Sequence, residues 1–443
     1  MPSTALSRAL VSRWQDAWLL AGVRTPFVDY TQSLSLASPI DLGIKAAREV
    51  FARSGASAAD VGTVIAASMA QTSFDAYVLP RHVGLYSGVP VEVPAHLVQR
   101  VCGSGIEIIS QAADTVSLGR ASLALCVGAE SMSRNPVAAY THRSGFRLGT
   151  PVEFKDFLWE ALHDPAVDTN MGGTAENLAR RYDIRRPEVD AYAARSFERA
   201  IAAQQSGFLA GEICPVKTET FESKELRPRG IKLLGKEPLA DRDTHIRPTP
   251  LETLAKIRPA FGGVQTGGNS SAIVDGAASA LVASSDYLKR LKVVPLARLV
   301  ACVAVGVPPQ IMGIGPVASI RALLAATGLK LSDIDRIELN EAFGAQVLAC
   351  VRELGIDEAK LNVNGGAIAI GHPLGASGVR LALTLARELQ RCGGRYGIAS
   401  ACIGGGQGIA LLIERVQAGH AVNESGDASC SAVNESGEAS CSL

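Results

Sequence analysis

Short apolar runs and longer amphipathic segments alternate along most of the chain. The runs at 61–69 and 121–129 are almost wholly apolar, as expected for strands that are buried on both faces of a sheet. The segment 39–55 has the periodicity of an amphipathic helix, with Pro39 near its start and Gly55 as its stop. Strands that alternate with helices in this way predict an α/β fold.

The second half of the chain repeats this pattern. It predicts helices at 316–328 and 378–394, and a strand that runs into a turn at 334–343. Residues 396–414 predict two strands around a glycine-rich turn. Both halves therefore contain strand–turn–helix units with a cysteine at a turn, which indicates two duplicated α/β halves.

The segment between the halves, 134–265, has a different composition. It is rich in Arg, Glu, Pro and Thr, has helical stretches at 174–184 and 186–207, and lacks convincing strands. We therefore predict a mainly helical loop domain, which suits a lid or a ligand-binding insertion.

Both ends of the chain lack the pattern of a packed domain. Residues 1–16 contain Ser and Arg but no acid before Asp16, and we expect a disordered leader or start-site extension there, with a weak transit peptide as the alternative. The tail contains two 11-residue repeats, 421–431 and 432–442, rich in Ser, Gly, Asn and acids, which predicts disorder. The predicted organisation is a leader (1–16), an N-terminal half (17–133, completed by about 266–293), the loop domain (134–265), a C-terminal half (294–416) and the tail (417–443).

Composition excludes several classes of protein. Lys plus Arg (43) balances Asp plus Glu (43), so no overall field favours nucleic acid or an anionic membrane. The nine cysteines lack C-x-x-C spacing, which argues against zinc sites and disulfide frameworks and favours reduced thiols. No apolar run reaches the ~18 residues that a membrane-spanning helix needs. We expect no metal, no nucleic-acid partner and no transmembrane segment.

Two glycine-rich turns carry a thiol. Cys102 precedes Gly103 and a predicted helix, whose N-terminal N–H groups would lower the thiol pKa and favour a nucleophilic thiolate. Cys402 precedes three glycines, whose N–H groups can approach a reacting oxygen, and its own thiol can carry a proton. For Cys102 taken alone, buried packing is at least as good an interpretation as catalysis.

Two further turns carry an amide and an imidazole. Asn340 stands at the end of a predicted strand, where α/β proteins place their chemistry, although a turn or cap residue is the ordinary alternative. His372 is held between Gly371 and Pro373, which suits a general base aimed at a neighbour. Four such turns favour a joint interpretation: a thiol nucleophile, a histidine base and a second thiol as acid and base.

The motifs around these turns resemble those of the thiolases, which are acyl-CoA:acetyl-CoA C-acyltransferases. "CGSG", "GAESMSRNP", "MGGTAENLA", "NEAF", "GHPLGASG" and "CIGGGQG" occur in the family's order, and the resemblance covers Ala21 to Glu414. It implies a five-layer αβαβα sandwich of two halves plus a loop domain, and a homodimer or homotetramer. It also implies coenzyme A as the substrate's handle, with no metal or redox cofactor.

The resemblance assigns roles to single residues. Cys102 matches the nucleophile that becomes acylated, His372 its base and Cys402 the second acid/base. Asn340 matches the residue holding a water that, with His372, stabilises an enolate oxygen, and Gly404 with the Cys102 N–H matches the other oxyanion hole. Positions that match coenzyme A contacts are Ser271, Ala342, Phe343, Met171 and Arg247.

The implied function is thiolysis of 3-ketoacyl-CoA in fatty-acid β-oxidation. Asn170 stands where short-chain synthetic members have His, and "HIRPTPLETLAKIRPAF" resembles the β-oxidation complex branch, although that branch commonly has His at the position of Asn340. Acetoacetyl-CoA synthesis and a non-catalytic acyl-CoA-binding protein are the alternatives, and Cys402 argues against a ketoacyl synthase. The resemblance also implies a cytoplasmic location, or a mitochondrial one in a eukaryote, and a β-oxidation complex α subunit as a candidate partner.

Overall fold

The structure is a computed structural model that describes residues 8–69, 76–140 and 142–416. Residues 1–7 of the predicted leader and the predicted disordered tail at 417–443 lie outside the described residues.

The described strands build an 11-stranded mixed sheet, in which nine strands follow the order β17-β18-β19-β16-β2-β15-β6-β4-β5, while β1 (Leu10–Arg13) pairs with β16 and β3 pairs with β15. The strands of the N-terminal half are β2 (Trp18–Arg24), β4 (Thr63–Ala67), β5 (Ala95–Val98), β6 (Leu123–Ser131) and β15 (Val274–Ala283), with β3 (Val28–Asp29) beside β15. Those of the C-terminal half are β16 (Ala297–Gly306), β17 (Arg336–Leu339), β18 (Tyr396–Ile403) and β19 (Gln407–Arg415). Only two residue pairs, Ala297–Leu19 and Arg298–Trp18, join the halves, so the sheet forms two β layers.

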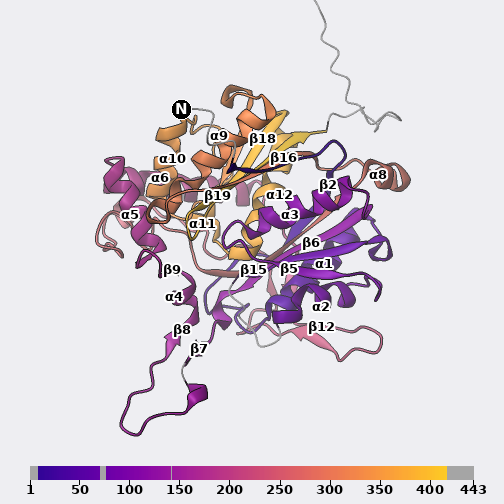
Figure 1. Ribbon diagram of the computed structural model, residues 1–443, viewed down its shortest axis with the longest axis horizontal. Helices are drawn as coiled ribbons and strands as arrows, with labels where there is room; N and C mark the ends of the chain where they lie inside the picture. Colours follow the sequence, from indigo (N-terminus) through magenta and orange to yellow (C-terminus); the bar gives the residue numbers. More distant parts are fainter. Residues whose placement is uncertain (1–7, 70–75, 141, 417–443) are drawn as a thin grey trace, which may run out of the picture.

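Helices complete five layers (Figure 1). Between the two β layers lie α3 (Ser104–Ser117) and α12 (Leu374–Cys392). One outer layer is α1 (Pro39–Ser54) with α2 (Leu79–Tyr86), and the other is α9 (Gly315–Thr327) with α10 (Gly344–Leu354); α8 (Ser285–Leu291) and α11 (Ala367–Ile370) are shorter. The predicted αβαβα sandwich is confirmed. Local signals set its helices: in α1, the Ser38 hydroxyl accepts from the Asp41 N–H and Gly55 ends the helix at φ 70°.

The two halves share one topology, which confirms the predicted duplication. β4 and β6 run parallel, as do β17 and β18, and in each half the next strand is antiparallel. The first strands, β2 and β16, each pair with the last strand of their own half. The helices α3 and α12 are therefore counterparts, and Cys102 and His372 both stand just before the start of such a helix.

Glycines let these two central helices touch at their N-terminal ends. A Cβ on Gly378 would lie 2.2 Å from the backbone nitrogen of Ile106, and one on Gly105 would lie 2.7 Å from that of Gly378. No larger residue fits at either position without moving a helix. The crossing therefore brings the turns before α3 and α12 together.

The structure corrects the prediction of a disordered leader. Leu10–Arg13 forms β1, which pairs antiparallel with β16. Trp14 is buried, and its indole N–H donates to Asp114 at 2.6 Å. The edge of β16 supplies the backbone partners for β1, and a four-residue strand with such a distant partner leaves no clear signal of its own in the sequence.

The segment 134–265 contains more than helices, which corrects the expectation that it lacks strands. Its helices are α4 (Phe157–Ala161), α5 (Met171–Arg181), α6 (Arg186–Gln205) and α7 (Leu251–Leu254). Its strands pair as β7 (Val137–Ala138) with β8 (Lys155–Asp156), β9 (His163–Asp164) with β10 (Thr169–Asn170), β11 (Val216–Lys217) with β14 (Leu239–Ala240), and β12 (Glu219–Phe221) with β13 (Arg229–Ile231). Strands of two or three residues are too short to show a period.

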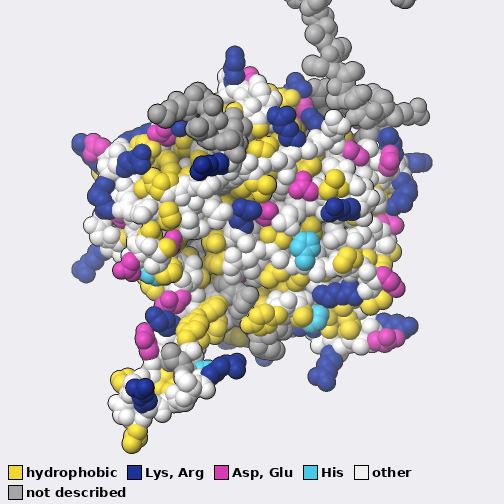
Figure 2. All heavy atoms as spheres, in the orientation of Figure 1, with side chains coloured by type: hydrophobic (Ala, Val, Ile, Leu, Met, Phe, Trp, Pro, Cys, Tyr) yellow, Lys and Arg dark blue, Asp and Glu magenta, His cyan; other side chains and the backbone are white. Residues whose placement is uncertain are grey.

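An arm between β7 and β8 projects from the body of the molecule (Figure 1). Apolar side chains gather where the arm leaves the body (Figure 2). The arm and its base expose several large apolar side chains: Val137, Tyr140, Phe146, Leu148, Val152, Phe154 and Trp159.

Among the described residues, one helical stretch, Pro309–Thr327, is long and apolar enough to span a membrane by length and composition alone. It includes α9, which packs on β16 and β19 as an outer layer of the sandwich, and 56% of its most apolar window is buried. Packing within the fold therefore explains its apolar character.

Candidate active site

The backbone in front of α3 presents Cys102. Val101 has a φ of 43°, a left-handed conformation that β-branched residues rarely adopt and that costs about 1–3 kcal/mol. Hydrogen bonds on both sides hold this turn, because the Ser104 hydroxyl accepts from the Arg100 N–H at 2.7 Å and donates to the Val101 carbonyl at 2.7 Å. The thiol is 6% exposed at the end of this strained turn.

The turn between β18 and β19 meets Cys102 from the other half of the fold. The backbone N–H of Gly404 interacts with the Cys102 thiol. A Cβ on Gly404 would lie 3.3 Å from Val101 and 3.4 Å from the sulfur of Met171. Cys402, fully buried at the end of β18, is close enough to Cys102 to interact with it electrostatically. The structure thus brings both cysteines and Gly404 together.

His372 is held in one orientation by Ser377. Its Nδ1 lies 2.6 Å from the Ser377 hydroxyl, which itself donates to the Pro373 carbonyl at 3.0 Å. With the hydroxyl hydrogen used there, the hydroxyl oxygen accepts from Nδ1–H, and this tautomer leaves Nε2 as the free base. The amide nitrogen of Asn340 lies 3.3 Å from Nε2 and can donate to it.

Asn340 also leaves an acceptor open. Its side-chain oxygen is buried and has no hydrogen-bond partner among the described residues. A buried oxygen without a partner is costly, and a water is the simplest group to satisfy it. This arrangement suits the water-holding role that the resemblance implies for Asn340.

Burial decides the protonation of the site. Desolvation raises the pKa of the Cys102 thiol to about 11, although the N–H groups of Gly404 and Cys102 act in the opposite direction. Desolvation also lowers the pKa of His372 to about 3, helped by the nearby Arg380 charge, and raises that of Cys402 well above its usual value. The backbone N–H groups thus lower the pKa of the Cys102 thiol as expected, but burial outweighs them and favours neutral thiols and a neutral imidazole in the free site.

Most of the predicted coenzyme A positions lie near Cys402. Met171, Ala342 and Phe343 join its apolar cluster with Met312, and the Ser271 N–H donates to the Ala342 carbonyl at 3.0 Å. Arg247 lies apart on the surface, where its guanidinium is 5.8 Å from the centre of the Phe197 ring. Four of the five positions therefore line one region beside the second cysteine.

Asn170 has a structural role. Its side-chain oxygen accepts from the Gly173 N–H at 2.8 Å and caps α5. Where the short-chain synthetic thiolases have His, this chain has an asparagine that caps the helix beginning at Met171.

Two buried carboxylates that the sequence did not single out support these turns. Glu341 accepts from Tyr192 at 2.8 Å and Ser196 at 2.7 Å on α6, and from the Ile368 N–H at 3.1 Å before His372. Glu130 accepts from the Gly375 N–H at 2.9 Å at the start of α12. Glu341 lies in the motif "NEAF" and Glu130 in "GAESMSRNP". Ser377 lies in "GHPLGASG". The charged and hydroxyl side chains of these motifs were the sequence features that could have identified the supporting residues.

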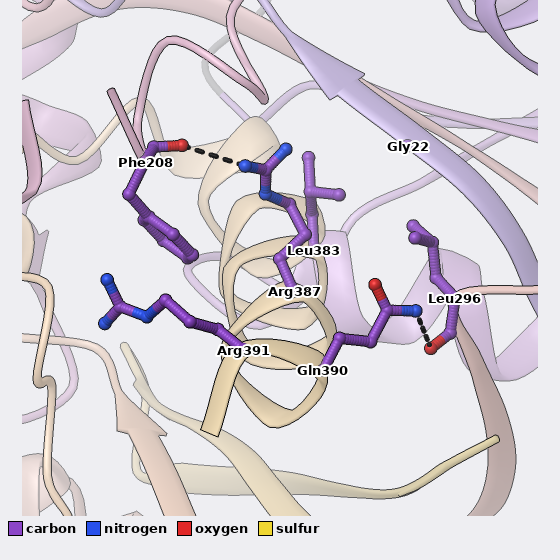
Figure 3. Close-up of a pocket in the computed structure, with 7 residues that line it drawn as sticks. All are labelled: Gly22, Phe208, Leu296, Leu383, Arg387, Gln390 and Arg391. Carbon is purple, nitrogen blue, oxygen red and sulfur yellow. Dashed lines mark hydrogen bonds between the residues drawn. The ribbon is translucent and has the colours of Figure 1, made fainter. Parts of the chain in front are cut away.

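A cavity of about 540 Å³ lies elsewhere, near the C-terminal end of α12 (Figure 3). Arg387 is about 20 Å along the helix from Leu374, at 1.5 Å per residue. The polar groups of the cavity bind its walls: Arg387 donates to the Phe208 carbonyl at 2.9 Å and Gln390 to the Leu296 carbonyl at 3.1 Å. This cavity shares no residue with the cysteine site.

The described cysteines are all free thiols, and no cluster of three His, Cys, Asp or Glu side chains in that part of the chain is arranged to hold a metal. Cys430 and Cys441 lie outside the described residues. A duplicated α/β sandwich with two thiols and a backbone N–H at one site, and an imidazole on an adjoining turn, holds the groups that a thiol-dependent acyltransferase needs.

Comparisons with known proteins give the family. The N-terminal domain of thiolases matches residues 18–286, and the C-terminal domain of thiolases matches 293–415. Human mitochondrial 3-ketoacyl-CoA thiolase is 42% identical over 90% of this chain and 98% of its own, and the beta-ketothiolase of Cupriavidus necator is 40% identical over 91% and 100%. The chain belongs to the thiolase family and is an acyltransferase.

Solved structures of thiolase-family enzymes have the same fold as this chain. The human mitochondrial thiolase in complex with CoA has a TM-score of 0.84 at 41% identity, and covers 90% of this chain and 98% of its own. Acetyl-CoA acetyltransferase from Bacillus anthracis has a TM-score of 0.83 at 36% identity, and covers 91% and 100%. Membership of this enzyme family sets aside the non-catalytic alternative.

The contact between Ser377 and His372 predicts that Ser377→Ala weakens turnover. Without the hydroxyl, Nδ1 loses the acceptor that fixes its tautomer, and we expect kcat for thiolysis to fall roughly tenfold to a hundredfold with little change in KM. Ser319→Ala is the matched control, because Ser319 is also a buried helical serine and donates to the Gly315 carbonyl at 3.2 Å. Equal kcat in both variants would contradict the positioning role.

The raised thiol pKa predicts slow, pH-dependent alkylation of the free enzyme. Only the thiolate reacts, so below pH 11 its fraction and the alkylation rate at Cys102 should rise about tenfold per pH unit between pH 7 and 10. Iodoacetamide labelling should be counted at Cys102 by peptide mass spectrometry, because Cys392 is exposed as well. A fast rate that is flat from pH 6 to 9 would instead indicate a preformed thiolate–imidazolium pair.

Proposed function

We propose that the protein cleaves 3-ketoacyl-CoA with coenzyme A, giving acetyl-CoA and an acyl-CoA two carbons shorter, in fatty-acid β-oxidation. The observation that carries the proposal is the meeting of Cys102 and Cys402 at one buried site with the Gly404 N–H. Membership of the thiolase family and the 3-ketoacyl-CoA thiolases among its relatives support the substrate class.

In the first half-reaction, Cys102 is the nucleophile. His372 Nε2 takes the thiol proton, and the sulfur attacks the C3 carbonyl of the substrate. The C2–C3 bond then breaks and its electron pair moves to C2, giving the enolate of acetyl-CoA. Cys402 donates its proton to C2, and acetyl-CoA leaves while the shortened acyl group stays on the Cys102 sulfur.

In the second half-reaction, coenzyme A removes the acyl group. The Cys402 thiolate takes the proton of the coenzyme A thiol, whose sulfur attacks the acyl thioester. The Cys102 sulfur leaves and recovers its proton from the His372 imidazolium, so every proton returns to its starting group. Two transfers through one covalent intermediate give ping-pong kinetics.

Hydrogen-bond donors stabilise the charges that develop on oxygen. The N–H groups of Gly404 and Cys102 face the sulfur that bears the acyl carbonyl and would hold its oxyanion. For the enolate oxygen we propose His372 together with a water held by Asn340, whose open buried oxygen supports this role.

Coenzyme A acts as substrate, and these steps need no metal or redox cofactor. We propose that Ser271, Met171, Ala342 and Phe343 contact its pantetheine part, because they lie around Cys402. Arg247, on the surface, would meet a phosphate of the nucleotide end.

Acetoacetyl-CoA synthesis is the second candidate, because every step above is reversible. The likeness to the acetyl-CoA acetyltransferase of Bacillus anthracis favours it.

We also propose that the protein forms a homodimer or homotetramer. Among the described strands, β5 ends the sheet and pairs only with β4, which leaves one backbone edge for a second copy. The apolar arm offers a further contact. Light scattering should therefore give a mass of two or four chains. For location, we propose the cytoplasm, or the mitochondrion in a eukaryote, where the mitochondrial relatives work; a β-oxidation α subunit stays a candidate partner.

The substrate proposal predicts thiolysis of 3-ketoacyl-CoA substrates longer than four carbons. A panel from four to sixteen carbons should show kcat/KM at six carbons or more at least equal to that at four, measured by loss of the 3-ketoacyl-CoA absorbance. Activity confined to four carbons would favour the synthetic function.

Substitution of Cys102 and of Cys402 should block different steps of the reaction. Cys102→Ser should reduce thiolysis about a thousandfold or more and abolish acyl labelling, because the nucleophile is lost. Cys402→Ser should still acquire the acyl label at Cys102 from an acyl-CoA, while C–C cleavage falls by a similar factor. Intact-protein mass spectrometry measures the label, and Cys126→Ser, at a buried thiol outside the site, is the control. Labelling of Cys102→Ser would refute the assignment.

A further inference from the structure

Each of the two cysteines has its own apolar surroundings. Cys102 belongs to a cluster of buried side chains that also contains Met69, Met132, Leu158 and Leu374. Cys402 belongs to a different cluster, with Met312 and Ala342 and with Met171 and Phe343 packed against it. The two clusters have no residue in common.

The proposed reaction decides which part of the substrate meets each cluster, and the inference rests on that proposed function. Cleavage of the C2–C3 bond leaves the shortened acyl group on the Cys102 sulfur, while C2 of the acetyl fragment faces Cys402. The alkyl chain of the acyl group therefore starts among the neighbours of Cys102, and the coenzyme A end of the substrate lies among those of Cys402.

The apolar side chains that share a cluster with Cys102 expose little surface. Met69, Met132, Leu158 and Leu374 are each between 2% and 7% exposed. An acyl chain on the Cys102 sulfur that extends among them must displace one of these side chains. Met69 and Met132 can adapt their shape, since methionine is unbranched and has several rotatable bonds.

Three of the four neighbours belong to the rigid sandwich. Met132 follows β6 directly and Leu374 begins α12, so elements of the sandwich hold their backbones. Met69 lies two residues beyond β4, where its N–H donates to the buried Glu130 carboxylate at 3.0 Å.

Leu158 is the exception. It is the one buried residue of α4, a five-residue helix at the base of the projecting arm (Figure 1). The Asp156 carboxylate caps this helix by accepting from the Leu158 N–H at 2.9 Å. The next residue, Trp159, is 53% exposed. Leu158 is therefore the member of the cluster whose backbone lies outside the layers of the sandwich.

We propose that Leu158 determines the length of acyl chain that the enzyme accepts. Its side chain closes the space beside Cys102, and a long acyl chain enters by displacing it. A smaller residue at this position extends the space and a larger one shortens it, while the chemistry at the two cysteines is unchanged.

The test compares kcat/KM for twelve-carbon and four-carbon 3-ketoacyl-CoA in the purified full-length enzyme and three variants. Leu158→Ala should raise the ratio of the two values about tenfold, because each additional buried methylene contributes about three- to fourfold. Leu158→Phe should lower the ratio by a similar factor. Trp159→Ala, at the exposed neighbour on the same helix, should leave the ratio within twofold of the wild type.

The four-carbon substrate also reports folding, because its short acyl group needs no displacement of Leu158. If Leu158→Ala no longer cleaves the four-carbon substrate, the test rests on Leu158→Phe, in which the ratio of the two kcat/KM values should fall. A ratio within twofold of the wild type in every Leu158 variant that cleaves the four-carbon substrate would overturn this inference and leave the proposed function intact. Wild-type enzyme that cleaves no 3-ketoacyl-CoA at all would instead overturn the proposed function.

Discussion

The contact between α3 and α12 in the middle layer is the constraint on which the rest of the structure depends. Gly105 and Gly378 allow the backbones of the two helices to touch, and Gly128 admits the carbonyl of Gly375, from which its Cβ would be only 2.1 Å away. A side chain at any of these positions would separate the two halves. Because the helices are counterparts in a duplicated fold, this one crossing brings the turns before them, and with them Cys102 and His372, to the same place.

Burial has a chemical consequence at this crossing. A thiol and an imidazole taken out of water both favour their neutral forms, and here desolvation outweighs the backbone N–H groups around the sulfur. A neutral thiol reacts slowly, since only the thiolate is nucleophilic, so the first step of the proposed reaction depends on a base for the thiol proton. The bond between Ser377 and His372 then matters, because it keeps the free base on Nε2.

Buried carboxylates connect the site to the rest of the molecule. Glu341 ties the turn that follows β17 to α6 of the segment between the halves, and Glu130 ties β6 to the start of α12. A charged group without solvent is stable only with several donors, so these contacts fix the distances between segments that are far apart in the sequence. The small helix α4, which carries Leu158, takes no part in these carboxylate contacts.

The sequence by itself determined the features that depend on neighbouring residues. Apolar runs, helix caps such as Ser38 and Gly55, and the glycine-rich turns around Cys102, His372 and Cys402 are local patterns, so the α/β class, the duplication and the candidate residues could be predicted. Only the tertiary structure decided the rest. The strand β1 exists because β16 offers it an edge, the join of the two β layers depends on two residue pairs, and the protonation of Cys102 depends on how completely other segments exclude water from it. Pairing and desolvation are properties of distant segments brought together, and a local pattern does not contain them.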